Sequence, residues 1–303
     1  MMILHHYPMS PFSEKMRLMY GYCDLEWQSV MTPESPPRPL VDPLAGGYRR
    51  IPVAQLGADV FCDSRIISAE VAQMTGKAEL DPGGLDESDQ ARAAQFEGEI
   101  FWAAVTSIPA RRILGKLFRN LSFGQAMRFL VDRVGIARHA HTKPVPPKLA
   151  GPMFEAHLQK LEQLLVGGRR YLGGDAPGYL DFAAYHTLWF KRVVGEQPMP
   201  DNLPTTTDWY ERLTALGHGQ VHEGSANDAL AAARDNAPRP IPAGLADGAG
   251  VGTRVMVQPD DYALDGTSGT LVGADSERWI VVLDDGGLGE VHAHFPRQGF
   301  RLS

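Results

Sequence analysis

The hydrophobic pattern of this chain changes its period twice, and that change constrains the fold more than any other feature. Up to about residue 80, short apolar runs alternate with segments whose apolar residues have helical spacing. Residues 88–235 keep helical spacing throughout, and from residue 251 onward apolar and polar residues alternate with period two. A period of two is typical of strands, and a period of about 3.6 is typical of helices. At roughly 100 to 200 residues per domain, a chain of 303 residues accommodates two or three such units.

We therefore predict three domains along the chain. They are a mixed β/α domain over residues 1–80, an all-helical domain over 88–237 and a small all-β domain over 245–303. A segment rich in glycine, proline and acidic residues at 81–87 marks the first linker, and the prolines between 238 and 242 mark the second.

The first domain shows a strand, a turn and a helix in succession. An apolar run over Ile3–Tyr7 stops at a proline and is followed by helical spacing over Pro11–Tyr22. Two further short runs, Val53–Leu56 and Val60–Cys62, are joined across a glycine and predict a hairpin. Ser64–Met74 is expected to be a helix, because its spacing is helical and it is followed by a glycine, a common helix stop.

The second and third domains differ in their elements. In the second we expect only helices, over roughly 88–118, 122–138, 152–166, 180–194, 206–216 and 225–235. In the third we expect about five short strands, because turn signals such as Asp265-Gly266 and Asp285-Gly286 separate its alternating segments. The strand spacing of this third domain resembles that of small SH3-like barrels.

Composition narrows the class of protein. With 44% hydrophobic and 21% charged residues, and no apolar run near the ~18 residues that a membrane span needs, we predict a soluble protein without a membrane partner. The first residues lack the pattern of a secretory signal, so we expect a cytoplasmic location. The net charge of −7 disfavours a nucleic-acid partner, which would need a basic face to neutralise phosphates.

Cysteine and histidine usage argues against redox and metal sites. Cys23 and Cys62 are too few for a disulfide framework and too far apart for a CxxC motif. Three histidine pairs, at 5 and 6, 139 and 141, and 292 and 294, are not accompanied by a convincing third ligand in the sequence. We therefore predict no metal site.

The segment Tyr7–Arg17 carries the strongest chemical signal. It places Ser10 at a helix N-cap and Pro11 at the first helical position, where unpaired backbone N–H groups and the helix dipole favour negative charge. A thiolate would be stabilised there, although Ser10 alone would pass for an ordinary cap. With its Ser-Pro-Phe start, the segment resembles the serine-type glutathione transferases, especially the tau class and omega-like relatives. Ser10 matches the position of their catalytic serine or cysteine.

Two further segments match the same family in order and spacing. The run from Arg49 to Val53 resembles the family segment that carries a cis-proline; the resemblance makes Pro52 that proline, Ile51 the backbone partner of the cysteinyl part of glutathione, and Arg50 a contact of its glycine carboxylate. The run from Cys62 to Ile67 resembles the family's acidic-Ser helix start. There Ser64 would bind the γ-glutamyl carboxylate and Asp63 its ammonium group.

The helical domain adds a match at Pro177–Ala184, which resembles the capping-box segment that opens a buried helix of this family. Gly178 stands where Ser or Thr is usual, so only half of the reciprocal box remains, and Asp181 is expected to be structural. A stripe at helical spacing is expected to be either core or the wall of an acceptor-substrate pocket; its members are Phe96, Ile100, Phe101, Val105 and Ile108.

The resemblance implies a fold and a reaction. The fold is a thioredoxin-like α/β N-terminal domain followed by an all-α domain, with the β domain as an addition. The reaction is transfer of glutathione, whose thiolate, stabilised by Ser10, attacks a small electrophilic or apolar substrate. Glutathione enters as a co-substrate and no other cofactor is needed. A homodimer is implied as well, because members of the family usually pair with two-fold symmetry.

Two alternatives stay open on the sequence alone. The first is a glutathione-dependent isomerase, and the second is a non-catalytic binding protein that uses the β domain for partner contacts. Three departures from the family pattern keep the non-catalytic alternative open. They are Arg65 after Asp-Ser, a proline-rich loop over Ser35–Pro43 and the half-formed capping box. A glutaredoxin-like redox role is disfavoured, because serine occupies positions 10 and 13, where both cysteines would stand.

Overall fold

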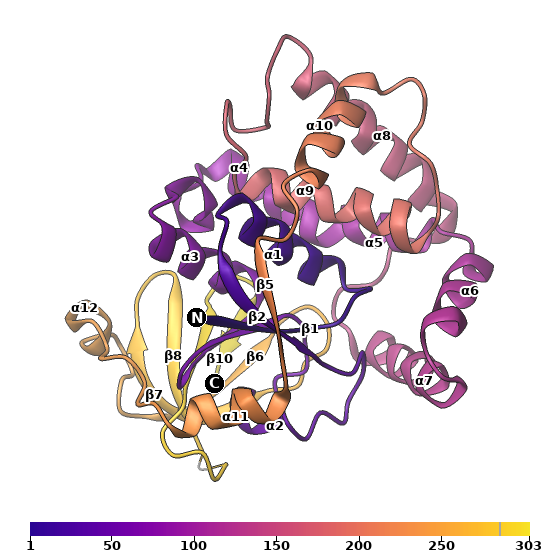
Figure 1. The fold of residues 1–303 in the computed structure, drawn as a ribbon. Coiled ribbons are helices and arrows are strands. Elements are labelled where there is room, and N and C mark those ends of the chain that lie inside the picture. Colours follow the sequence, from indigo (N-terminus) through magenta and orange to yellow (C-terminus); the bar gives the residue numbers. More distant parts are fainter. Residues whose placement is uncertain (285) are drawn as a thin grey trace.

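The computed structural model describes residues 1–284 and 286–303 (Figure 1). Its N-terminal part is a sheet of four strands in the order β2-β1-β3-β4, with β1 parallel to β2 and antiparallel to β3. These strands are β1 (Met2–His6), β2 (Glu26–Met31), β3 (Val53–Leu56) and β4 (Asp59–Cys62). This is the thioredoxin-like arrangement expected for the first domain.

Helices cover both faces of that sheet. On one face lie α1 (Pro11–Tyr22) and α3 (Ser64–Thr75), and on the other lie α2 (Asp42–Ala45) and α11 (Ala226–Arg234) (Figure 1). Successive residues of β1 point to opposite faces, so Met2 and Leu4 join the core under α1 and Ile3 joins the core under α11. All five residues of β1 are therefore buried.

The helical part begins with α4 (Glu87–Gln95) and continues without a loop through a π-helical turn, η3 (Phe96–Ile100), into α5 (Phe101–Thr106). The expected single helix over 88–118 is wrong in its second half, because the chain breaks at Pro109 and restarts as α6 (Ala110–Asn120). Proline lacks an N–H group and disfavours helical backbone in the residue before it, which accounts for the break.

The remaining helices follow the predicted pattern closely. All eleven residues of α9 are buried, as expected for a helix that is apolar around its whole circumference. Asp181 in its first turn accepts hydrogen bonds from the backbone of Leu172 and Gly178 and from the indole of Trp209, so its role is structural, as predicted. The remaining helical elements are α7 (Phe123–His139), α8 (Pro147–Leu165), α9 (Tyr179–Trp189), η4 (Phe190–Val194) and α10 (Pro204–Thr214). Two short 3-10 turns, η1 (Ala78–Leu80) and η2 (Pro82–Gly84), lie between α3 and α4.

A strand interrupts the region that we expected to be wholly helical. β5 (Gln220–Gly224) returns to the N-terminal sheet and pairs in parallel with β2. Its residues are largely exposed and only one of them, Val221, is a large apolar residue, so the segment lacks the alternating pattern that predicts a strand. β5 extends one edge of the sheet and leads directly into α11.

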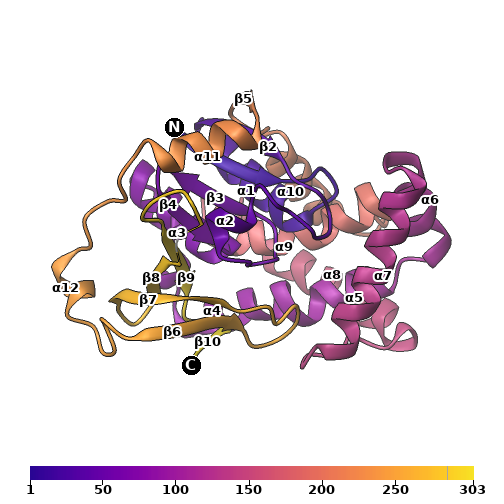
Figure 2. The same cartoon turned by 90° about the horizontal axis from the view of Figure 1, so that it is seen from below.

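The C-terminal extension continues the other edge of the sheet. It forms five strands as predicted, but among the described residues they line up in the order β10-β6-β7-β8-β9 and then join β4, giving one sheet of ten strands (Figure 2). β9 pairs in parallel with β4, so the extension is joined to the N-terminal sheet. Its five strands are consistent with the small β domain that we expected, and the SH3-like barrel stays a prediction. The elements are α12 (Ala243–Ala246), β6 (Arg254–Pro259), β7 (Thr267–Ala274), β8 (Arg278–Leu283), β9 (His292–Pro296) and β10 (Phe300–Leu302).

A buried polar network fastens the extension to β4. Asp59 accepts hydrogen bonds from the backbone and side chain of Arg239, at 2.9 and 3.2 Å, and its other oxygen lies 2.7 Å from Nε2 of His294. Arg239 also forms an ion pair with the buried Glu70 of α3 at 2.6 Å. Burial would raise the pKa of Asp59, but the bonds from His294 and Arg239 lower it below its usual value.

Within residues 1–284 and 286–303, no helix combines the length and apolarity needed to cross a bilayer. The same residues contain no group of three His, Cys, Asp or Glu side chains placed to hold a metal ion. Of the histidines considered as ligands, His5 instead contacts Gln55 and His6 contacts Ser29 and Arg17.

We expect Asp59→Ala to lower the free energy of unfolding by about 1 to 3 kcal/mol, because it leaves the buried His294 without its hydrogen-bond partner, while the half-exposed Arg239 keeps Glu70. Urea unfolding at pH 7 measures this loss. Asp284→Ala is the matched control, since it removes a carboxylate from an exposed ion pair with Arg254, where little change is expected. Equal and small losses in both variants would show that the network does not anchor the extension.

Candidate active site

Ser10 occupies the N-terminus of α1, as the sequence predicts. Its backbone is extended, with φ −80° and ψ 117°, and its Oγ accepts a hydrogen bond from the Ser13 backbone N–H at 3.1 Å. Pro11 follows as the first helical residue. Ser10 is almost fully buried, yet it lines a cavity, so its hydroxyl proton remains available to a group that enters there.

The second predicted segment lies just before β3. The Ile51–Pro52 peptide bond is cis, the geometry that the resemblance implies. Arg50 precedes it, and its guanidinium stacks at 4.2 Å on the ring of Tyr262 from the C-terminal extension. The same guanidinium donates to the Asp261 carboxylate and to the Tyr262 carbonyl, while its Nε has no hydrogen-bond partner among the described residues.

The third segment opens α3. Asp63 is the N-cap residue and accepts a hydrogen bond from the Arg65 backbone N–H at 2.9 Å. Its φ of 110° lies in a region that residues other than glycine rarely adopt, at a cost of about 1 to 3 kcal/mol. Ser64 is the first residue of the helix and is buried. Burial raises the pKa of the Asp63 carboxyl.

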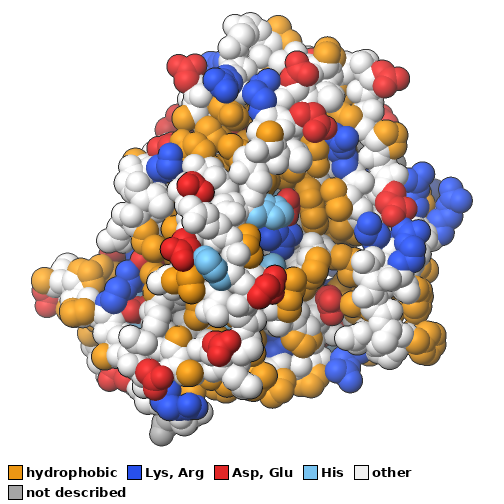
Figure 3. All heavy atoms as spheres, viewed as in Figure 1, with side chains coloured by type: hydrophobic (Ala, Val, Ile, Leu, Met, Phe, Trp, Pro, Cys, Tyr) orange, Lys and Arg blue, Asp and Glu red, His pale blue; other side chains and the backbone are white. Residues whose placement is uncertain are grey.

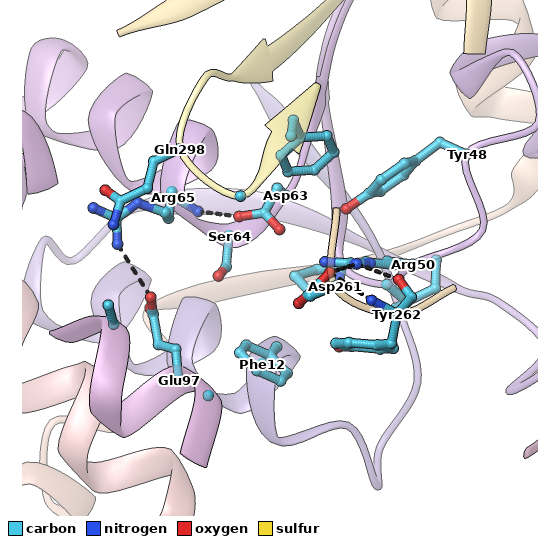
Figure 4. A pocket seen from close by; sticks show the side chains of 16 residues that line it. Phe12, Tyr48, Arg50, Asp63, Ser64, Arg65, Glu97, Asp261, Tyr262 and Gln298 are labelled. Atoms are coloured by element: carbon cyan, nitrogen blue, oxygen red, sulfur yellow. Dashed lines mark hydrogen bonds and ion pairs between the residues drawn. The ribbon is translucent and has the colours of Figure 1, made fainter. Parts of the chain in front are cut away.

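The structure brings all six predicted residues to two adjoining cavities. The smaller one, of about 250 Å³, is lined by Arg50, Ile51, Pro52, Asp63 and Ser64 (Figure 4). The larger one, of about 420 Å³, is lined by Ser10 and again by Arg50 and Ile51. Phe12 and Tyr262 also line both.

Charge is concentrated at the two ends of the smaller cavity. At one end Arg65 lies beside Glu97, with Nη1 3.2 Å from Oε2, and Gln298 lies next to them (Figure 4). At the other end stand Arg50 and its partner Asp261. Asp63 and Ser64 lie between these ends, so the cavity presents a cation at each end and an acid with a hydroxyl in the middle.

A fully buried lysine stabilises the Glu97 end. Lys15 of α1 forms an ion pair with Glu97 and donates to the Tyr179 hydroxyl at 2.9 Å and to the Ser64 hydroxyl at 3.4 Å. Burial alone would raise the pKa of Glu97, but Lys15 and Arg65 outweigh it and hold the pKa at about 2. Burial lowers the pKa of Lys15.

Several residues of the site were missed in the sequence. Lys15 and Glu97 lie 82 positions apart, and no local pattern links them. Asp261, Tyr262 and Gln298 belong to the C-terminal extension, whose role the sequence left open. Tyr48 could have been noticed as an aromatic residue beside Arg49-Arg50; it is buried, and its hydroxyl lacks a hydrogen-bond partner among the described residues.

The larger cavity is mainly apolar. From the predicted stripe, Phe101 and Val105 line it, whereas Phe96, Ile100 and Ile108 are buried, so the stripe serves both as pocket wall and as core. Trp102, Phe129 and Phe190 add further aromatic wall; Arg38, from the proline-rich loop, is held by the carbonyls of Pro33, Glu34 and Arg49. Burial lowers the pKa of Arg38 to about 10.

Comparison with known proteins matches residues 4–77 to the family described as glutathione S-transferase, N-terminal domain. Among solved structures, a GST-like protein from Pseudomonas syringae is similar over 100% of this chain and 98% of its own, with 30% identity and a TM-score of 0.77. The chain belongs to the glutathione S-transferase family. All six predicted site residues lie inside the matched segment.

Two further structures resemble this glutathione S-transferase family member less closely. They are a glutathione S-transferase from Rhodospirillum rubrum F11, with 17% identity and a TM-score of 0.49, and one from Sinorhizobium meliloti 1021, with 21% and 0.47. Each similarity covers 71% of this chain and 88% of the other. No curated protein matches the chain. The similarity to the Pseudomonas syringae protein extends over the C-terminal extension, since it covers this whole chain.

Replacement of Glu97 should lower the free energy of unfolding more than replacement of Lys15. Glu97→Gln leaves Lys15 fully buried without a carboxylate, at a cost of about 3 to 5 kcal/mol in the free energy of unfolding. Lys15→Met should cost less, because Glu97 keeps Arg65 and the Tyr179 hydroxyl. The double variant should regain part of the Glu97→Gln loss. Chemical unfolding at pH 7 compares the three, and the opposite order of the two single variants would refute this assignment.

Proposed function

We propose that this protein is a glutathione-dependent transferase in which Ser10 stabilises the glutathione thiolate for attack on an electrophilic, largely apolar substrate. One observation carries the proposal: a cavity with a cation at each end adjoins an apolar cavity lined by Ser10. Glutathione bears a carboxylate at each end and a thiol in the middle. Its charges therefore match the charges of the smaller cavity.

The contacts follow from the residues at each position. Arg50 binds the glycine carboxylate, and its unpaired Nε supplies a free donor for this purpose. Ser64, at the start of α3, and the neighbouring Arg65 at that end of the cavity bind the γ-glutamyl carboxylate, and Asp63 binds the ammonium group. Ile51 lines both cavities, so a cysteinyl residue paired with its backbone would direct the sulfur toward Ser10.

Ser10 acts by donating a hydrogen bond to the sulfur. Its oxygen already accepts from the Ser13 backbone, which orients the hydroxyl and leaves its proton for the ligand. A thiol ordinarily titrates near pH ~8.5, and lowering that value to about 6.5 requires roughly 2.7 kcal/mol of differential stabilisation. One hydroxyl together with the helix N-terminus can supply this amount.

The substrate that accepts the thiolate lies in the larger cavity. Its walls are mainly aromatic, including Phe101, Trp102 and Phe129, which favours a small molecule with an apolar or aromatic body. Isomerisation would use the same thiolate but return glutathione unchanged, so a product without bound glutathione would favour that reaction. A non-catalytic role predicts glutathione binding without a shifted thiol.

A homodimer and a cytoplasmic location stay predictions from the sequence. The β4 edge of the N-terminal sheet is covered by β9 of the same chain, so any dimer would have to use another surface than that edge. Sedimentation of the full chain measures the oligomeric state directly.

Titration of the bound thiol tests the mechanism. In mixtures of glutathione and protein, thiolate absorbance in the ultraviolet should titrate well below pH ~8.5 for the wild type and return toward that value for Ser10→Ala. Ser13→Ala is the matched control, because it removes a neighbouring buried hydroxyl that has no hydrogen-bond partner among the described residues. An unshifted thiol in the wild type, or an equal shift in Ser10→Ala, would contradict the proposed role of Ser10.

Asp261 should weaken glutathione binding, since its carboxylate already pairs with the Arg50 guanidinium that the glycine carboxylate needs. Asp261→Asn should therefore lower the Kd for glutathione by about three- to tenfold, whereas Arg50→Ala should raise it by at least tenfold. Calorimetric titration gives both values. Weaker binding by Asp261→Asn would mean that Asp261 supports the ligand instead of competing with it.

A further inference from the structure

The hairpin of α6 and α7 exposes a continuous apolar stripe. On α7 the exposed residues Phe123, Met127, Val131 and Val134 follow one another at helical spacing; Phe123 and Val131 are 73% and 69% exposed. On α6 Leu114 and Phe118 are exposed four positions apart. The Phe118 and Phe123 rings stack with centroids 6.0 Å apart, which joins the two halves into one surface.

This hairpin buries little within its own chain. All residues of α6 and α7 are described, and only Leu117, Ala126 and Ile136 among them are buried. The inner side of α7 lines the larger cavity through Phe129 and Arg133, among others. The exposed stripe is therefore a second apolar side of the hairpin that the fold does not use.

Basic residues accompany the stripe. Arg111 stands three positions before Leu114, and Arg138 four positions after Val134, so each extends the exposed side of its helix. Arg111, Arg128 and Arg138 are exposed, and none forms an ion pair within residues 1–284 and 286–303. At the right edge of Figure 3, Lys and Arg side chains and hydrophobic side chains gather over these two helices.

The charge of this segment opposes that of the whole chain. Residues 110–143 hold eight Lys and Arg residues and one acidic residue, Asp132, in a chain whose net charge is −7. Asp132 pairs with Arg49 and is largely buried, and Glu196 pairs with Lys116 and Arg119 of α6. Arg111, Arg128 and Arg138 remain without an ion-pair partner among the described residues. A surface with exposed large apolar residues and unpaired arginines matches an anionic, apolar partner.

We propose that the α6–α7 hairpin is a docking surface for an anionic lipid bilayer. Phe118, Phe123 and the aliphatic residues of the stripe enter the boundary between headgroups and acyl chains, while Arg111 and Arg138 bind lipid phosphates. This is peripheral binding and needs no membrane-spanning helix. It departs from the expectation of no membrane partner, which considered only long apolar runs along the sequence.

Two features favour a bilayer over other occupants. A two-fold contact between copies of this chain would pair this basic surface with itself and bring few carboxylates to its arginines. The hairpin also lies at the periphery of the molecule in both ribbon views (Figures 1 and 2), where a flat bilayer can reach it. The docking surface does not depend on the proposed transferase reaction, although it would bring the apolar cavity behind α7 close to membrane-dissolved molecules.

The test is binding of the full-length protein to vesicles in a flotation assay. Vesicles of phosphatidylcholine with about one third phosphatidylglycerol should bind the protein, and phosphatidylcholine alone or high salt should weaken binding strongly. Phe118→Glu/Phe123→Glu should weaken binding at least tenfold. Arg111→Gln/Arg138→Gln should weaken it about thirtyfold, because each cation near an anionic bilayer contributes roughly fivefold.

Matched controls place the same changes elsewhere on the surface. Leu149→Glu/Val166→Glu alters exposed apolar residues at the two ends of α8, and Arg234→Gln/Arg301→Gln removes two exposed arginines; neither should reduce binding. Circular dichroism checks that every variant is folded. The proposal is overturned if anionic vesicles do not bind, if the control pairs weaken binding as much as the stripe variants, or if the stripe variants abolish a dimer and leave vesicle binding intact.

Discussion

Strand β4 carries a neighbour on each edge, β3 on one side and β9 on the other, and the placement of the site depends on the second pairing. The register sets His292 beside Asp59 and His294 beside Phe61. Asp59 at the start of β4 binds both His294 and Arg239, so the strand pairing and the buried network fix the extension together. Because β9 is held there, the loops after β6 and β9 reach over the start of α3 and close the smaller cavity with Tyr262 and Gln298.

Charge in the site is balanced before any ligand enters. Arg50 is paired with Asp261, and Lys15 and Arg65 share Glu97. Isolated cations buried at these positions would be costly, and the paired carboxylates offset that cost. Ligand binding is then an exchange of partners, in which the ligand's carboxylates must compete with or add to those that the protein supplies. The strained backbone of Asp63 lies at the centre of this arrangement.

The parts predicted from the sequence are those that local chemistry specifies. A serine followed by proline at a helix start, an Ile-Pro-Val segment and an Asp-Ser helix cap each show their role within a few residues, and the structure brings Ser10, Pro52 and Ser64 to adjoining cavities. The family was predicted from the same motifs. The pairing of distant strands could not be predicted, because it depends on partners far away in the chain. β5 has too few apolar residues to be predicted as a strand, and nothing in the sequence of β9 indicates that it pairs with β4. Lys15 and Glu97 are residue types common on surfaces, and only the packing of the helices buries Lys15 and brings Glu97 to it.

The strands of the ten-stranded sheet become available for pairing at very different times during synthesis of the chain. During synthesis β4 and β2, which emerge within the first 62 residues, have open edges, since their outer partners β9 and β5 are more than 150 residues further along the chain. Open edges invite pairing with other chains, and contacts between distant segments form late and slowly. Both edges of the N-terminal sheet therefore stay exposed in the nascent chain until β5 and β9 have been synthesised. Dependence on chaperones should then be concentrated in the period before the last fifty residues leave the ribosome, and a chain that lost β9 would keep that vulnerability permanently.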